Sequence, residues 1–299
     1  MIKIEEQIKS NYIFKKIANN ITKKQLFKII KYNKSFQYKL DIGIIDYKNY
    51  YGQIEIELIT ATKEDKNNFI NIKEGYESYY HIYFNNNKNE IKQTYFNKNE
   101  NITKINIIID FEIKSFEKIF YNCRCIEKIK FIKFKRNDIN NMKYMFNGCY
   151  ALKEINFNEF NTINVTNMSC MFYKCSKLKK LNLNKFNTIS VTNMSFMFNE
   201  CYLLEDLDIN NFNTINVNDM CCMFNECYSL KELKINNFNT SNVTNMSCMF
   251  FGCSSLKDLN INNFNTNKET NIRNMFKECS EELRKKIKNK YKNITYQAF

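Results

Sequence analysis

The segment Asn167-Met-Ser-Cys-Met-Phe-Tyr-Lys-Cys-Ser-Lys-Leu-Lys-Lys-Leu-Asn-Leu-Asn-Lys-Phe-Asn-Thr188 decides the fold, because close copies of it recur along the chain. The period is 26 residues and does not drift. Seven cysteines keep this spacing throughout: Cys123, Cys149, Cys175, Cys201, Cys227, Cys253 and Cys279. Met-Phe pairs recur in step with them, from Met145-Phe146 to Met275-Phe276. A fixed period of this length predicts a stacked repeat architecture.

Each unit combines two apolar periodicities. Five side chains share the spacing of one helical face: Met168, Met171, Phe172, Cys175 and Leu178. Asn167 precedes them, and its side chain can accept a hydrogen bond from a free N–H group in the first turn of a helix. Apolar and polar residues then alternate over residues 180–184, which is typical of a short strand with one buried face. One unit therefore predicts a short helix followed by a short strand.

These units are too short to fold alone, since an isolated helix of about three turns is marginal in water. Stacking on neighbouring units must stabilise them. Strands pair about 4.8 Å apart, whereas packed helices need about 8–10 Å, so the stack should arc with its strands on the inner side. The predicted fold class is α/β: a curved solenoid with one short helix and one short parallel strand per 26-residue coil.

The stretches from Asn164 to Phe172 and from Leu178 to Thr188 resemble the BspA-type leucine-rich repeat, the 26-residue repeat of bacterial surface proteins. The resemblance covers about Lys114 to Leu283. It implies a leucine-rich-repeat-like solenoid that serves adhesion and protein–protein contact without catalysis. The first residues lack the cationic stretch of a signal peptide, so we expect an intracellular location, although the family is often found at the cell surface.

Four regions are expected along the chain: a helical region at 1–45, a small β-rich region at 46–110 that caps the solenoid, the solenoid at 111–283, and a C-terminal capping helix and tail at 281–299. The N-terminal part should be α+β. Its predicted strands are Ile54–Ile59, Tyr79–Phe84, Ile91–Phe96 and Ile102–Ile109, separated by Asn-rich turns. At the other end, a charged helix would shield the last coil from water.

The helical region also allows an alternative function. Ile13-Phe14-Lys15-Lys16-Ile17, followed by Leu26 and Tyr32-Asn33-Lys34, resembles an F-box, the module that links repeat domains to ubiquitin ligases. This resemblance implies a substrate adaptor. A plain capping subdomain explains the same helical pattern, so the sequence leaves both possibilities open.

The formal charge of +14 raises the question of an anionic partner. Residues 142–267 hold ten lysines and ten acidic residues, so the basic excess lies in the flanks. One basic cluster adjoins the repeats: Lys128, Lys130, Lys133, Lys135 and Arg136. The strand face lacks the stacking aromatics that single-strand binders use, which disfavours nucleic acid as the partner. No segment approaches the roughly 20 apolar residues of a transmembrane helix.

The cysteines are expected to be structural. Those of the 26-residue series share a face with Met and Leu, which predicts buried free thiols, and the expected helix spacing places successive members beyond the reach of a disulfide. Cys170, Cys222 and Cys248 share a slot with aromatic residues and should fill space. Cys123-Arg124-Cys125 and Cys221-Cys222 depart from the pattern and are the pairs most open to reaction. Neither has the Cys-x-x-Cys spacing of a zinc site, so we expect no metal.

The sequence also argues against an enzyme. His81 is the single histidine, and its setting in Tyr79–Tyr83 is typical of a packed strand and not of a general base. The chain contains neither Gly-x-Gly-x-x-Gly nor Gly-x-x-x-x-Gly-Lys, and its five glycines leave little room for phosphate-binding loops. We therefore expect no catalytic residue and no cofactor.

Two ladders of asparagine run through the loops, one from Asn158 to Asn262 and one from Asn161 to Asn265. An amide at a fixed loop position usually hydrogen-bonds its own backbone, so both ladders are interpreted as turn locks.

The candidate binding site is the outward-pointing side of the strands, which varies from unit to unit while the core does not. It comprises Lys128, Lys130, Glu154, Asn156, Lys180, Asn182, Asp206, Asp208, Glu232, Lys234, Asp258 and Asn260. This face is basic at its start and acidic in its middle. The hypothesis is that a protein of complementary charge docks here, with Asp206 and Asp208 at the centre. The sequence identifies neither the partner nor the oligomeric state.

Overall fold

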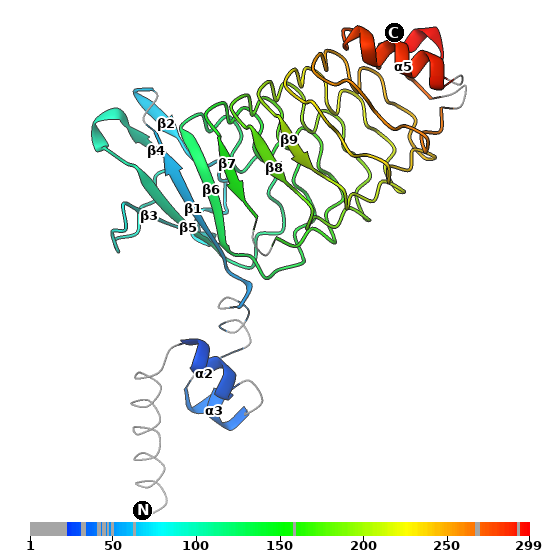
Figure 1. Cartoon of the computed structure of the whole chain (residues 1–299). Coiled ribbons are helices and arrows are strands. Elements are labelled where there is room, and N and C mark those ends of the chain that lie inside the picture. Colours follow the sequence, from blue (N-terminus) through cyan, green and yellow to red (C-terminus); the bar gives the residue numbers. More distant parts are fainter. Residues whose placement is uncertain are drawn as a thin grey trace, which may run out of the picture. The chain divides into compact units, whose positions relative to one another are not determined.

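A computed structural model describes residues 23–30, 34–40, 43, 46, 48, 51–61, 64–157, 160–266, 270–291 and 294–299 (Figure 1). The chain forms two compact units, Met1–Gln53 and Ile54–Phe299. The first contains helices α2 (Lys23–Ile30) and α3 (Lys34–Lys39). Within it the buried Phe27 ring lies edge-on to Tyr51. Residues 13–17 and 32–33, which carry most of the F-box-like pattern, lie outside the described residues.

The second unit begins with a five-stranded sheet in the order β3-β5-β1-β6-β7. Its strands are β1 (Ile54–Thr60), β3 (Tyr80–Phe84), β5 (Lys104–Ile109), β6 (Ile126–Lys133) and β7 (Glu154–Asn156). The first four pair antiparallel, and β6 pairs parallel with β7. A separate antiparallel pair joins β2 (Lys66–Asn68) to β4 (Tyr95–Asn97). Single 3-10 turns occur at η1 (Glu77–Tyr79), η2 (Lys98–Glu100) and η3 (Tyr296–Ala298).

The sheet arises from strict alternation. In β1, Ile54, Ile56 and Leu58 are buried, while Glu55 and Glu57 point the other way. Strand β6 takes part in both architectures, because it pairs antiparallel with β1 on one side and parallel with the first repeat strand on the other. The N-terminal sheet is thereby continuous with the repeats.

The predicted α/β solenoid is wrong, because the repeats contain no helix over their described residues. The stretch from Asn167 to Cys175, predicted to be helical, is a run of turns. Four of its N–H groups, from Met168 to Lys174 at alternate positions, donate to carbonyls 25 positions further on, in the next unit. Of the N–H groups between them, those of Met171 and Tyr173 donate to the carbonyl three residues earlier, and that of Ser169 donates to the Asn167 side chain. Donors that a helix would use internally therefore join neighbouring units.

Left-handed backbone explains why the helical spacing fails to give helices. Each full unit has two residues with positive φ, four positions apart, such as Cys170 (φ 56°) and Lys174 (φ 62°). An α-helix cannot continue through such residues. A turn that repeats every four residues still returns side chains to the same side, so the apolar stripe from Met168 to Leu178 is compatible with this conformation as well.

The spacing between units corrects the predicted curvature. Seven phenylalanines stack through the core, with ring centroids 5.4 to 5.6 Å apart in successive pairs: Phe120, Phe146, Phe172, Phe198, Phe224, Phe250 and Phe276. Isolated parallel bridges join the Asn167 slot of each unit to the next. The units are thus separated by a strand-like distance at this edge, and the helix spacing of about 8–10 Å from which the curved shape was inferred is absent.

The strand edge is only partly ordered into strands. Strands β8 (Lys180–Asn182) and β9 (Asp206–Asp208) pair in parallel register, Leu181 opposite Leu207. Residues 232–234 and 258–260 occupy the same slot in the following units without forming strands. No backbone hydrogen bond joins 232–234 to β9 or to 258–260 in the part of the chain that the structure describes.

Buried threonines lock the units together between the two edges. The Thr188 hydroxyl, 1 % exposed, donates to the Asn213 carbonyl at 2.8 Å and accepts from the Asn213 N–H at 2.7 Å. Thr214 and Thr240 make the same pair of contacts one unit and two units on. The Asn187 side chain accepts from the N–H two residues later, which confirms that this ladder locks turns.

The C-terminal end covers the last unit. Helix α5 (Glu281–Lys290) begins at Ser280, whose hydroxyl caps the Leu283 N–H, and it buries Leu283 and Ile287. The final residue, Phe299, stacks on Phe276 and so continues the ring stack. In the described part of the chain, no helix combines the length and apolarity needed to span a membrane.

Candidate functional site

The strand face, defined by the twelve residues predicted from the sequence, lies at the surface. All twelve side chains are exposed or half-exposed. They alternate along the chain with the buried row Ile129, Leu181, Leu207, Leu233 and Leu259. The register places Lys180 opposite Asp206 and Asn182 opposite Asp208. The alternation that predicted this face thus reproduces which side chains point outward.

Charges at the start of the strand face are already paired. Lys128 Nζ lies 2.8 Å from a Glu154 carboxylate oxygen, and this hydrogen bond raises the pKa of Lys128. The neighbouring Lys153 pairs with Glu127 at 2.9 Å. Each pair joins two adjacent units. The first third of the face therefore offers a partner little unpaired charge.

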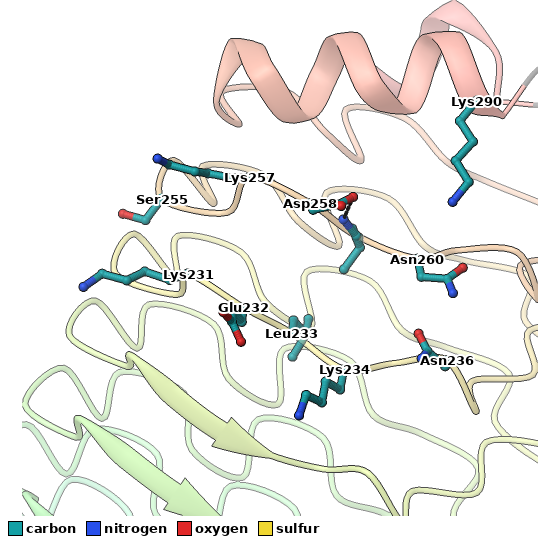
Figure 2. A pocket seen from close by; sticks show the side chains of 11 residues that line it. Lys231, Glu232, Leu233, Lys234, Asn236, Ser255, Lys257, Asp258, Asn260 and Lys290 are labelled. Carbon is teal, nitrogen blue, oxygen red and sulfur yellow. Dashed lines mark hydrogen bonds between the residues drawn. The ribbon is translucent and has the colours of Figure 1, made fainter.

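Two hollows adjoin one another on the later part of the face. The acidic cavity, of about 440 Å³, lies between β9 and the next unit and is lined by Glu205, Asp206, Leu207, Asp208, Asn210, Lys231, Glu232 and Lys234. The basic cavity, of about 660 Å³, lies one unit further on and is lined by Lys231, Glu232, Leu233, Lys234, Asn236, Ser255, Lys257, Asp258, Leu259, Asn260 and Lys290 (Figure 2). The segment 231–234 forms the wall between them.

The two cavities differ in charge. Four carboxylates and two ammonium groups line the acidic cavity, and four ammonium groups and two carboxylates line the basic one. Within the described residues, none of the ion pairs involves a charged residue of either cavity. Figure 2 shows Lys290 extending from α5 toward Asn260, while Lys231 and Lys257 project from adjacent units at the opposite end. These charges are available to a ligand.

Sequence reasoning missed four charged residues of these cavities: Glu205, Lys231, Lys257 and Lys290. The first three share one repeat slot, directly before Asp206, Glu232 and Asp258, so extending the predicted strand by one residue would have found them. Lys290 reaches the cavity from the capping helix. No pattern within the repeat could have indicated it.

Three members of the basic cluster considered for nucleic acid make contacts within the protein. Arg136 is 6 % exposed, and its guanidinium donates to three main-chain carbonyls between Asp110 and Ile113 and to Asp138. Lys133 lies 3.7 Å from a Glu55 carboxylate oxygen. Lys128 is paired as described above. Few of these charges are free to meet phosphates.

The cysteine series, called here the Cys ladder, is buried with free thiols, as predicted. From Cys149 onward each thiol donates to a phenylalanine carbonyl of the preceding unit, as Cys201 does to Phe172 at 3.1 Å. Burial raises the pKa of Cys201 to about 12. Cys125 is also buried, with its pKa raised by burial to about 12. Nucleophilic chemistry needs a thiolate, which these environments disfavour.

His81 has both ring nitrogens engaged. One lies 3.3 Å from a Glu90 carboxylate oxygen and the other 3.2 Å from Asp110. A hydrogen bond from Lys92 is the main cause that lowers the pKa of Glu90. A histidine held between two carboxylates serves here as a tie between β3 and the loop at Asp110. Over the described residues, no three His, Cys, Asp or Glu side chains are placed to hold a metal ion.

The comparison with protein families gives one match. A model described as "Mycoplasma protein of unknown function, DUF285" matches residues 114–206 and 203–296, which is more than half of the chain. It supports a repeat protein and attaches no activity to the repeats. No curated protein and no solved structure matches the chain.

Proposed function

Since the chain belongs to the DUF285 family, whose description names no activity, we propose from the strand face that it is a non-enzymatic scaffold for a protein partner. The partner docks across the acidic and basic cavities. It presents cationic side chains to Glu205, Asp206 and Asp208, and anionic side chains to Lys257 and Lys290.

The observation that carries this proposal is the charge arrangement of the two adjoining cavities. Together the cavities, of about 440 Å³ and 660 Å³, give a hollowed surface with a negative and a positive end. Complementary charge steers encounter and fixes register, while unlike partners are rejected by repulsion. A folded protein or an extended segment with opposite charges in sequence order matches this pattern better than a small neutral molecule.

A fixed frame beneath a variable surface supports the same function. The buried rows of Leu, Phe and Cys and the Thr hydroxyl bonds hold successive units in register. Substitutions at the outward strand positions leave these contacts untouched. Binding residues are commonly carried in this way on a scaffold whose packing they do not affect.

The resemblance of Asn164–Phe172 to BspA-type repeats also supports the proposal, because that family serves adhesion and protein–protein contact. This resemblance lies in the sequence pattern of the unit, so it does not depend on the helix that was expected from that pattern.

The test is comparative affinity purification. The full chain and the double variant Asp206→Asn/Asp208→Asn are used as baits, recovered proteins are quantified by mass spectrometry, and the binding of the recovered partner is then titrated directly. An exposed ion pair contributes about 0.2–1 kcal/mol. Loss of two carboxylates should therefore weaken binding by about 2- to 30-fold, and added salt should reduce the difference.

The matched control is Glu74→Gln/Glu77→Gln, which also removes two exposed carboxylates but lies outside both cavities. It should bind as the unaltered chain does. If both double variants retain the same partner with the same affinity, the strand face is not the docking site and the proposal fails.

A further inference from the structure

Two cysteines outside the Cys ladder lie side by side at the turn edge, the edge of the repeats formed by the turns of Asn167–Cys175 and the equivalent residues of the other units. Cys222 and Cys248 are 26 positions apart and half-buried, whereas every member of the Cys ladder is buried. Both have left-handed backbone, with φ of 53° and 55°. Their side chains therefore leave the backbone with the same geometry in two successive units.

The two units are in register at strand-like spacing here. The Cys222 N–H donates to the Ser247 carbonyl at 2.9 Å, and the Phe224 N–H donates to Met249 at 2.9 Å. Parallel neighbours at this spacing have Cα atoms about 5 Å apart, inside the range of about 4.4–6.8 Å found in disulfides. The sequence argument against bonds between units assumed helix spacing, so it does not apply to this pair.

The thiols also interact with each other. Interaction with Cys221, and to a lesser extent with Cys248, holds the pKa of Cys222 below its ordinary value. Burial raises the pKa of Cys248, partly offset by nearby Arg273 and Lys277. The more acidic sulfur is thus the better nucleophile and the other the natural second thiol.

We propose that Cys222 and Cys248 form a dithiol site that exchanges with low-molecular-weight disulfides and closes to a disulfide between two repeat units. The inference stands independently of the proposed function. It concerns the same two units whose later residues, 231–236 and 255–260, form the basic cavity.

The reaction balances in two steps. The Cys222 thiolate attacks one sulfur of the small disulfide, whose S–S bond breaks; one small thiol leaves with the proton that Cys222 has lost, and a mixed disulfide remains. Cys248, after losing its proton to solvent, attacks the Cys222 sulfur and displaces the second small thiol, which takes up that proton. Two protein thiols are oxidised to one disulfide, and one small disulfide is reduced to two thiols.

Cys170 provides an internal comparison. It occupies the same slot and is also left-handed, with φ of 56°, but its neighbours in that slot are Tyr144 and Phe196. It has no thiol in the adjacent units at this position. Only the pair formed by Cys222 and Cys248 brings two cysteines together in consecutive units of this slot.

The test treats the native full chain with glutathione disulfide, blocks remaining thiols and maps the product by mass spectrometry. The unaltered chain should lose two hydrogens and carry a bond between Cys222 and Cys248. Cys248→Ser should stop at a single glutathione on Cys222. Cys222→Ser should react about tenfold more slowly or not at all, because the nucleophile is absent.

Two controls make the outcome decisive. Cys221→Ser and Cys170→Ser should both still form the bond, and circular dichroism should show that each variant is folded. A bond that maps to Cys221 and Cys222, or a folded unaltered chain that exchanges no faster than the buried Cys ladder, would overturn the proposal.

Discussion

Replacing Thr214 by valine should destabilise the repeats severely for so small a change. The hydroxyl is 1 % exposed, donates to the Asn239 carbonyl at 2.8 Å and accepts from the Asn239 N–H at 2.8 Å. Valine has nearly the same shape but neither donor nor acceptor, so both backbone groups of Asn239 lose their partner. An unsatisfied buried group costs about 1–3 kcal/mol, and the added methyl returns about 0.8 kcal/mol. With two such groups, we expect a net loss of about 1–5 kcal/mol.

Thr192→Val is the matched control. The Thr192 hydroxyl is exposed and donates to the Thr166 carbonyl at 3.2 Å, but that carbonyl also accepts the Thr192 N–H at 2.9 Å. No buried group is orphaned, so this variant should change stability by less than about 0.5 kcal/mol.

Urea titrations followed by circular dichroism compare the two variants, and hydrogen exchange at the Asn239 amide reports the local effect. The amide should exchange faster in Thr214→Val because its acceptor is gone. Since repeat arrays can unfold in stages, the exchange measurement keeps the test valid when the titration is not two-state. Equal stability of the two valine variants would refute the idea that the threonine hydroxyls hold the units together.

Three further predictions follow from the same structure. Glu278→Gly should stabilise the chain by about 0.5–1 kcal/mol in thermal unfolding, because Glu278 has φ of 61°. Lys177→Gly, at a position without positive φ, should destabilise it by a similar amount. A stability change of the same sign in both variants would contradict this. Burial raises the pKa of Cys201 from 9.0 to about 12, so the contribution of its thiol to stability is complete below pH 9 and is lost as the pH rises toward 12. Cys201→Ala should therefore reduce the pH dependence of the unfolding free energy in that window by up to about 1.4 kcal/mol per pH unit. An unchanged slope would disprove the assignment. Ser280→Ala should lower the unfolding free energy measured in urea by about 1–2 kcal/mol, because the Ser280 hydroxyl caps α5 and donates to the Leu256 carbonyl. A loss of stability no greater than that of Ser254→Ala would argue against the cap.

The sequence predicted the period, the core and the outward face, because each depends on which residues recur and not on backbone conformation. The Cys ladder is buried and the strand positions such as Asp206 are exposed, as the alternation required. Three of the four N-terminal strands expected from their apolar runs are present with ends shifted by one or two residues, whereas the expected strand at 91–96 overlaps β4 (Tyr95–Asn97) only at residues 95 and 96. These features follow from burial, to which apolar periodicity is directly sensitive.

The helix prediction failed for a specific reason. Lys174 and Glu200 are good helix formers, yet both have left-handed backbone, with φ of 62° and 58°. The signal that could have revealed this is Gly148 and Gly252, which fill the same slot with φ of 74° and 70°. Two glycines recurring at one position of a supposed helix indicate a backbone that L-residues adopt only at a cost. Tertiary stacking overrides that local preference.

The residues of the strand edge can change to suit different binding partners, because contacts elsewhere hold the units together. Turn-edge hydrogen bonds, ring stacking and threonine hydroxyls fix the spacing of every unit, including the two that form the basic cavity. The ladder between β9 and residues 232–234 can therefore remain open without loss of register. The strand edge thus offers backbone groups and charges that are unpaired, and the contacts that hold the units together do not depend on it. These are the properties that a binding surface needs. Docking should consequently protect backbone amides of 232–234 from hydrogen exchange while leaving the turn edge unchanged.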